Sequence, residues 1–96
     1  MMSELPIDIS KLKGKELDKA ILRAGLIAEL DAISLYEQMA VMTEDELVRK
    51  VLLEIAREEK THVGEFLALL LEMDQELAEE LEKGKAEVAE LKGSQF

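Results

Sequence analysis

The sequence has no cysteine, and its 96 residues include only one proline, Pro6, and three aromatic residues. The absence of cysteine excludes disulfides, cysteine-based zinc sites, iron–sulfur ligation and a rubredoxin-like electron-transfer module within this chain. The remaining composition is rich in leucine, alanine, glutamate and lysine, which predicts an all-α fold. Because so short a chain buries little of its own surface, its apolar faces are expected to need a partner chain.

Basic residues are also scarce, since 22 acidic residues face 12 basic ones and the formal net charge is -10. This balance disfavours nucleic acid and anionic membranes as partners and favours cations near the surface, although a charged face is most often a solubility device. Charged residues interrupt every apolar run before it reaches the length of a bilayer, and no signal-peptide pattern opens the chain. We therefore expect a cytoplasmic protein, or one enclosed within a cytoplasmic compartment.

The periodicity of the apolar residues predicts one domain of three helices. Residues 1–14 lack a clear period and are expected to form an extended lead-in. Helical spacing then predicts helices over residues 15–42, 44–73 and 75–92. The first two would each be about 40 Å long, and their short connection requires an antiparallel hairpin. The third is short and strongly acidic.

Candidate capping residues mark the ends of these helices. The segment Thr43–Glu46 has the form of a capping box, in which the Thr43 hydroxyl would accept from the backbone of Glu46. Asp74 is the expected N-terminal cap of the third helix, and Gly93 is its expected C-terminal stop. Gly84 lies in the apolar row of that helix and marks either a close contact or a break, which the sequence leaves open.

Two buried-looking rows carry ionisable residues where apolar ones are expected. On the first helix the row is Leu22, Leu26, Glu29, Ile33, Tyr36 and Ala40, and on the second it is Leu52, Ile55, Glu59, His62, Phe66 and Leu69. An unpaired carboxylate that leaves water is strongly destabilising unless a cation or hydrogen bonds offset the cost. The shared phase of Glu29, Glu59 and His62 therefore predicts a metal site.

The types and spacing of these residues indicate which site this would be. One glutamate from one helix and a Glu-x-x-His pair from another form the ligand set that occurs twice in ferritin-like di-iron bundles. This chain has one set, so two copies would pair into a four-helix bundle that holds two metals near the twofold axis. Carboxylates with one imidazole per metal suit iron, with manganese, zinc or calcium as substitutes. The Glu-x-x-His spacing alone is weak evidence among 17 glutamates, so the prediction rests on the phase.

Ordinary structural roles compete with this interpretation at several positions. His62 and a buried glutamate could form a purely structural hydrogen-bonded pair. Tyr36 could serve packing alone, or its hydroxyl could hydrogen-bond a metal-ligating carboxylate. Glu58 projects about 100° away from its neighbour Glu59, toward solvent or another subunit, and Glu37 and Glu65 are expected on the helix surface.

The segments Ala28–Gln38 (AELDAISLYEQ) and Arg57–His62 (REEKTH) resemble the two signature helices of the encapsulated ferritins. The similarity covers roughly residues 17–71, and the short acidic third helix extends it. Ala28 and Leu35 depart from the better-known pattern, which has a second acidic residue and a tryptophan at these positions. The departures leave the route by which metal enters open, while the oxidation site itself is matched.

The resemblance also implies a role for each matched residue. Glu29, Glu59 and His62 correspond to iron ligands, with Glu59 bridging the two irons of a dimer. Tyr36 corresponds to the tyrosine that lines the site. Asp31 stands where an acidic residue at the point of metal uptake is expected.

The same resemblance implies a ferroxidase that oxidises Fe(II) with dioxygen and stores the product as mineral inside an encapsulin shell. Homodimers would form the active sites, and five dimers would close into a decamer. A peroxide- or oxygen-scavenging di-iron protein and a non-catalytic helical oligomerisation or cargo module are the alternatives. The tail, residues 92–96, is too generic to identify as a shell-targeting peptide, so a trimmed chain and a fusion to the shell protein both stay open.

Overall fold

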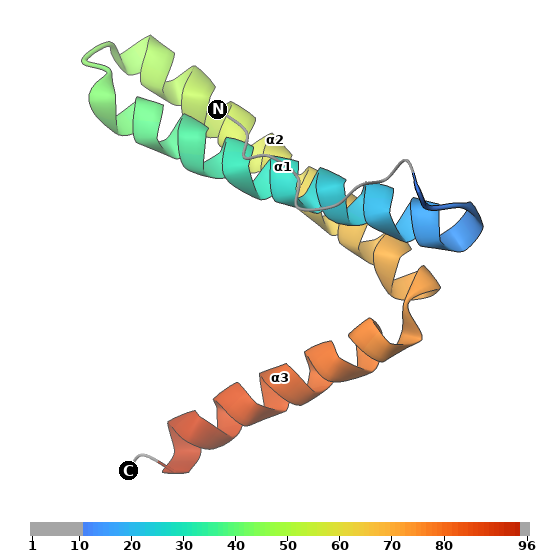
Figure 1. Ribbon diagram of the computed structural model, residues 1–96. Helices are drawn as coiled ribbons and strands as arrows, with labels where there is room; N and C mark the ends of the chain where they lie inside the picture. Colours follow the sequence, from blue (N-terminus) through green and yellow to red (C-terminus); the bar gives the residue numbers. More distant parts are fainter. Residues whose placement is uncertain (1–10, 95–96) are drawn as a thin grey trace.

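The computed structural model describes residues 11–94, which form the three helices α1 (Gly14–Met42), α2 (Glu46–Met73) and α3 (Gln75–Ser94). No strand occurs within residues 11–94, so the all-α prediction is confirmed. Figure 1 shows α1 and α2 side by side as an antiparallel hairpin, from which α3 departs at an angle. Most of the predicted lead-in lies outside the described residues.

The turn between α1 and α2 is capped by a different residue from the one predicted. The Asp45 carboxylate accepts a hydrogen bond from the Val48 backbone at 2.9 Å, so Asp45 is the N-cap and α2 begins at Glu46. The Thr43 hydroxyl instead accepts from the Asp45 backbone at 3.2 Å. The predicted capping box at Thr43 is therefore wrong, because Asp45, a stronger capping residue than threonine, immediately precedes the helix and caps it.

Arg49 of α2 stabilises the same turn through hydrogen bonds to the end of α1. Its side chain donates to the Ala40 carbonyl at 2.9 Å and to the Thr43 carbonyl. The last turn of α1 carries no basic residue of its own, so Arg49 supplies the donors that the free carbonyls at a helix end require. The hairpin turn is therefore fixed by hydrogen bonds from α2.

Asp74 joins α3 to the hairpin. One of its carboxylate oxygens accepts from the Leu77 backbone at 3.0 Å, which confirms the predicted cap of α3. The other oxygen accepts from the Arg23 guanidinium of α1 at 3.2 Å. The same carboxylate thus starts α3 and ties it to the first helix.

Gly84 and Gly93 do not have the effects on α3 that the sequence predicts. The helix runs through Gly84 without a break, and no atom lies within 4 Å of the point where a Cβ would stand there. Gly93 does not stop the helix, which continues to Ser94. Within this chain α3 is an uninterrupted helix with open space beside Gly84.

The buried residues of the described chain come from the hairpin alone: Ala20, Leu22, Ala40, Ala56 and Leu70. The accessible surface is 7377 Å², against about 5,500 Å² expected for a compact monomer of this mass. Several large apolar side chains stay exposed, including Val41 and Met42 at 83% and 78%. So much uncovered apolar surface is typical of a subunit that packs against another chain.

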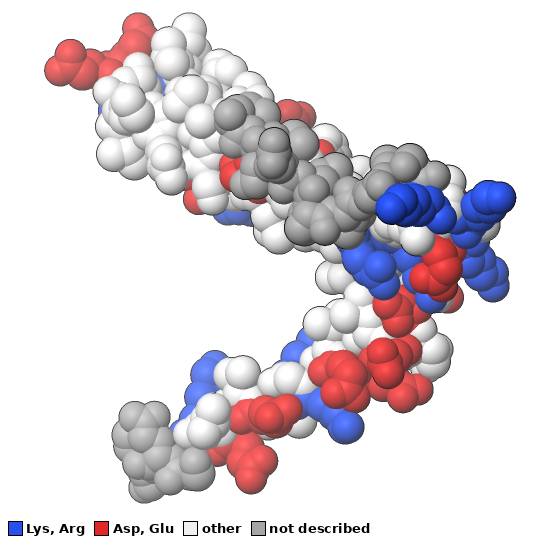
Figure 2. Space-filling view, in the orientation of Figure 1, with Lys and Arg blue, Asp and Glu red and all other residues white. Residues whose placement is uncertain are grey.

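Charge is distributed unevenly over this open shape. Figure 2 shows acidic side chains over α3 and basic side chains around the beginning of α1. None of the three helices described here combines the length and the apolarity that a bilayer crossing demands.

Candidate metal centre

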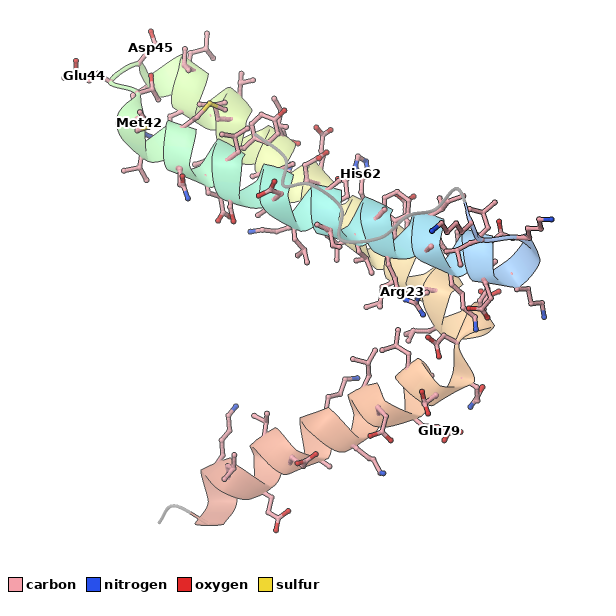
Figure 3. All side chains as sticks on the ribbon, viewed as in Figure 1. Arg23, Met42, Glu44, Asp45, His62 and Glu79 are labelled. Carbon is pink, nitrogen blue, oxygen red and sulfur yellow. The ribbon has the colours of Figure 1, made fainter. Side chains whose placement is uncertain are left out.

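The hairpin brings the three predicted ligand residues together from two helices. Glu29 lies near the middle of α1, and Glu59 and His62 lie one turn apart on α2. The His62 Nδ1 atom is 3.2 Å from a Glu29 carboxylate oxygen and 3.1 Å from a Glu59 carboxylate oxygen. His62 projects from the side of the hairpin in Figure 3. The shared helical phase of Glu29, Glu59 and His62 therefore predicted correctly that their side chains lie close together.

The distances within this cluster suit a shared metal ion. One potential ligand atom from each residue lies within 4.8 Å of the other two. Two donor atoms bound at right angles to one ion, each at about 2.1 Å, would stand about 3 Å apart. The two measured contacts of His62 are close to that spacing. A cation can thus replace the present hydrogen bonds with little movement of the side chains.

Electrostatics favour a cation at the same place. The hydrogen bond to Glu29 and the nearby carboxylates raise the pKa of His62. The contact with Glu29, together with partial burial and charge repulsion, raises the pKa of Glu59. The carboxylates beside His62 favour its charged form, whereas repulsion and partial desolvation disfavour the charged form of Glu59. A divalent cation there would relieve the repulsion between Glu29 and Glu59.

The cluster is closed on one side and open on the other. The side chains of Glu29 and Glu59 are 19% and 18% exposed, whereas that of His62 is 46% exposed. A hollow lined by Glu58, Thr61, His62 and Glu65 lies on this open side. Three candidate ligands with an exposed imidazole would give iron an incomplete coordination sphere, which would leave room for ligands from elsewhere.

Two further candidate residues stand apart from the cluster. Tyr36 is half-buried, and within residues 11–94 its hydroxyl makes no hydrogen bond to the three ligand side chains. Asp31 is half-buried and is not a member of the cluster found among the described residues. Glu37 is exposed as expected and pairs with Lys60 of α2 at 2.9 Å.

The predicted apolar rows hold except at two positions of α2. Leu69 is 48% exposed and its neighbour Leu70 is buried instead, so the core row shifts by one residue at this end of the helix. His62 is exposed within the single chain rather than buried. The row prediction assumed that both facing surfaces were covered, and one chain covers only part of them.

Sequence reasoning missed two features beside the cluster. Glu58 and Glu65 are exposed, as predicted, but the sequence did not indicate that both line the hollow next to His62. Glu58 lies four residues before His62 and Glu65 three residues after it, and this helical spacing is the signal that could have placed both beside the histidine. Gly25 was not singled out. It lies one turn before Glu29 on α1, and a Cβ built there would come closer to a neighbour, the Phe66 ring of α2, than at any other described glycine.

Comparisons with known proteins agree on one group. A family model described as EncFtn-like matches residues 5–85. The ferritin-like-encapsulin shell fusion protein of Pyrococcus furiosus is 63% identical over 79 residues, which cover 82% of this chain and 23% of that protein. The chain thus spans about a quarter of the length of this relative. The crystal structure of the encapsulated ferritin domain from Pyrococcus furiosus matches with a TM-score of 0.83 and 56% identity, over 97% of this chain and 95% of that one.

Proposed function

The chain belongs to the EncFtn-like family, and we propose that it is a ferroxidase that oxidises Fe(II) to Fe(III) with dioxygen at a di-iron site between two copies. One observation carries the proposal. Glu29 of α1 and Glu59 and His62 of α2 converge at distances that suit a common metal ion. Two carboxylates with one imidazole form a hard, oxygen-rich ligand set that suits iron.

In this reaction the protein would bind the two Fe(II) ions and stabilise the positive charge of the Fe(III) product. Two Fe(II) substrates lose one electron each, and dioxygen takes up the two electrons with two protons. Carboxylate ligands stabilise the product Fe(III) more than Fe(II), because the interaction with an anionic oxygen grows with the charge of the ion. Glu29, Glu59 and His62 would serve as iron ligands, and Glu59 would bridge the two irons, as the family resemblance implies.

The proposal includes the dimer, because one chain holds a single ligand set. The open side of the cluster at His62 and the uncovered apolar surface of the hairpin support the pairing of two chains there. A second copy would bring another Glu29, Glu59 and His62 and would complete a four-helix bundle. Closure of five such dimers into a decamer is part of the same proposal and rests on the family resemblance.

The partner proposed for this assembly is an encapsulin shell. The relative from Pyrococcus furiosus is named as a fusion of a ferritin-like part and an encapsulin shell. The family resemblance implies an open ring of subunits without a cage of its own, so oxidised iron would need an external container. We propose that this chain delivers Fe(III) to a mineral inside an encapsulin nanocompartment of the cytoplasm.

The test is Fe(II)-dependent oxygen consumption by the purified protein. Glu59→Gln and His62→Ala should each lower the rate by more than the ~10–100-fold typical of losing a residue that only supports a ligand. Glu54→Gln is the matched control, because Glu54 is exposed on α2 and pairs only locally with Arg57. Unchanged rates in both site variants would reject the assignment. Native mass spectrometry should find two irons per dimer in the wild type and fewer in the variants.

The oxidant is tested in the same assay. Hydrogen peroxide supplied without dioxygen should oxidise Fe(II) on the protein more slowly than dioxygen does. A clear preference for peroxide would instead indicate the scavenging function. Absence of bound metal, with assembly unaffected by a chelator, would indicate the non-catalytic helical module.

A further inference from the structure

Among the described glycines, Gly25 of α1 is the one at which a side chain would collide with the neighbouring helix. A Cβ built on Gly25 would stand 2.9 Å from both the Cε1 and Cζ atoms of Phe66 and 3.2 Å from its Cδ1 atom. Separations below 3.0 Å essentially never occur around a real Cβ, so the edge of the Phe66 ring occupies the space of a side chain at position 25. The ring thus packs directly on the backbone of α1.

This contact lies beside the metal centre. Gly25 precedes Glu29 by four residues on α1, and Phe66 follows His62 by four residues on α2. Since the helices are antiparallel, the Gly25–Phe66 contact and the Glu29–His62 contact are adjacent steps along the same interface. Side chains on a helix lean toward its N-terminus, so the Phe66 ring leans toward His62.

The Glu29–His62 contact is the part of the cluster that depends on how far apart the helices lie. The 3.1 Å contact between His62 and Glu59 lies within α2 and is set by the geometry of a single helix. The 3.2 Å contact between His62 and Glu29 crosses from one helix to the other. Ligand distances must hold to about 0.2 Å for a metal site, so a shift of the helices by half an ångström would separate the two halves of the ligand set.

We propose that Gly25 and Phe66 form a spacer that sets the distance between α1 and α2 at the metal centre, and that Gly25 is a positioning residue for Glu29. The inference rests on the proposed function and adds a residue that binds no metal. Any side chain at position 25 must displace the ring or the helix by several tenths of an ångström. That displacement acts on Glu29 and His62 first, because they are the next contact along the interface.

The test measures Co(II) binding, because the visible spectrum of Co(II) reports its ligands and Co(II) is not consumed by oxidation. Gly25→Ala should weaken Co(II) binding about 10-fold or more, as loss of a residue that supports a ligand typically does, and should change the spectrum. Gly64→Ala is the matched control, because no atom lies within 4 Å of a Cβ at that glycine on α2. It should leave both affinity and spectrum unchanged.

Rescue and stability controls separate positioning from general destabilisation. Phe66→Leu removes the far ring atoms, so the Gly25→Ala/Phe66→Leu double variant should recover most of the lost Co(II) affinity. Leu70→Ala weakens the core far from the cluster and should lower the melting temperature without changing the Co(II) spectrum. The inference is overturned if Gly25→Ala binds Co(II) like the wild type, or if affinity falls equally in Leu70→Ala.

The proposed function fails in a different way. If the wild type and His62→Ala bind Co(II) equally weakly, no metal centre exists, and both the function and the spacer are rejected. If the wild type binds Co(II) and His62→Ala does not, the centre stands whatever happens at Gly25. The variants at Gly25 then decide the spacer alone.

Discussion

The hairpin and α3 are built from similar residues, yet they differ in what holds them in place. The hairpin contains all the buried residues of the described chain and the contacts that cross from α1 to α2. In α3 the residues from 82 to 93 are all exposed, and the ion pairs of Lys83 and Lys85 reach only one turn back along the same helix. The hairpin is thus stabilised by contacts between its own two helices, whereas α3 has an apolar face that stays exposed.

The pattern of α3 shows that this face is not simply a solvated surface. Leu77, Leu81, Val88 and Leu91 recur at helical spacing, and Val88 and Leu91 are 54% and 69% exposed. An isolated helix of this length is marginal in water, because most helix stability in proteins comes from packing of the apolar face. The two regions therefore differ in their content: the hairpin contains the candidate metal centre, and α3 contributes an exposed apolar row.

The largest expected effect compares one leucine of the hairpin with one valine of α3. Leu70→Ala should lower the free energy of unfolding by about 2–5 kcal/mol, since Leu70 is only 2% exposed and its loss leaves a cavity. Val88→Ala should change it by no more than about 0.5 kcal/mol, as for other exposed positions. Urea unfolding of the metal-free protein, repeated over a range of protein concentrations, measures both. A large loss in Val88→Ala that grows with protein concentration would show that α3 packs on another copy.

A smaller effect is expected at the turn that closes the hairpin. Asp45→Ala removes the N-cap of α2 and should cost about 1 kcal/mol, the usual loss for a capping aspartate. Thr43→Ala should cost less, because the Thr43 hydroxyl accepts only from the turn residue Asp45. Thermal unfolding of the two variants compares them directly. A larger loss in Thr43→Ala would restore the capping box that the sequence predicts.

A matched pair of glycines tests whether α3 is free of close neighbours. Gly64 of α2 and Gly84 of α3 both have no atom within 4 Å of a Cβ, so alanine fits at either. Each substitution should stabilise its helix by about 0.5–1 kcal/mol, because glycine loses more backbone entropy than alanine. Circular dichroism melting curves provide the measurement. A gain at Gly64 with a loss at Gly84 would place a second chain against α3, and would give Gly84 the close contact that the single chain lacks.

The helical fold and the meeting of the three candidate ligand side chains could be predicted from the sequence, because both depend on local periodicity. Apolar residues at steps of three and four fixed the helices, and Glu29, Glu59 and His62 stood in phase with them. Two helices joined by a short turn pack against each other as an antiparallel hairpin. A phase that is right on each helix therefore brings the three side chains together without knowledge of the tertiary packing.

The cap of α2, the role of Gly25 and the ion pair at α3 could not be predicted from the sequence. Thr43 and Asp45 are both good capping residues, and the difference between such caps is under about 1 kcal/mol. The importance of Gly25 depends on Phe66, which lies far along the chain and meets it only through the register of the hairpin. The Arg23–Asp74 ion pair, which connects α1 to the start of α3, is not predicted by any helical period.

The smallest expected effect is a pH dependence at Asp74, the residue that joins the two regions. The backbone hydrogen bond from Leu77, with Arg23 and Lys19 nearby, holds the pKa of Asp74 below its ordinary value. A carboxylate with a lowered pKa in the folded state contributes stability above its unfolded pKa of about 3.9, and that contribution is lost as the pH falls through the folded pKa. The melting temperature of wild type minus that of Asp74→Asn should therefore shrink as the pH falls from about 5 to about 3. In an Arg23→Gln background most of this pH dependence should remain, because the hydrogen bond from the Leu77 backbone is the larger cause of the lowered pKa. A melting-temperature difference that does not vary with pH would show that Asp74 holds α3 without its charge.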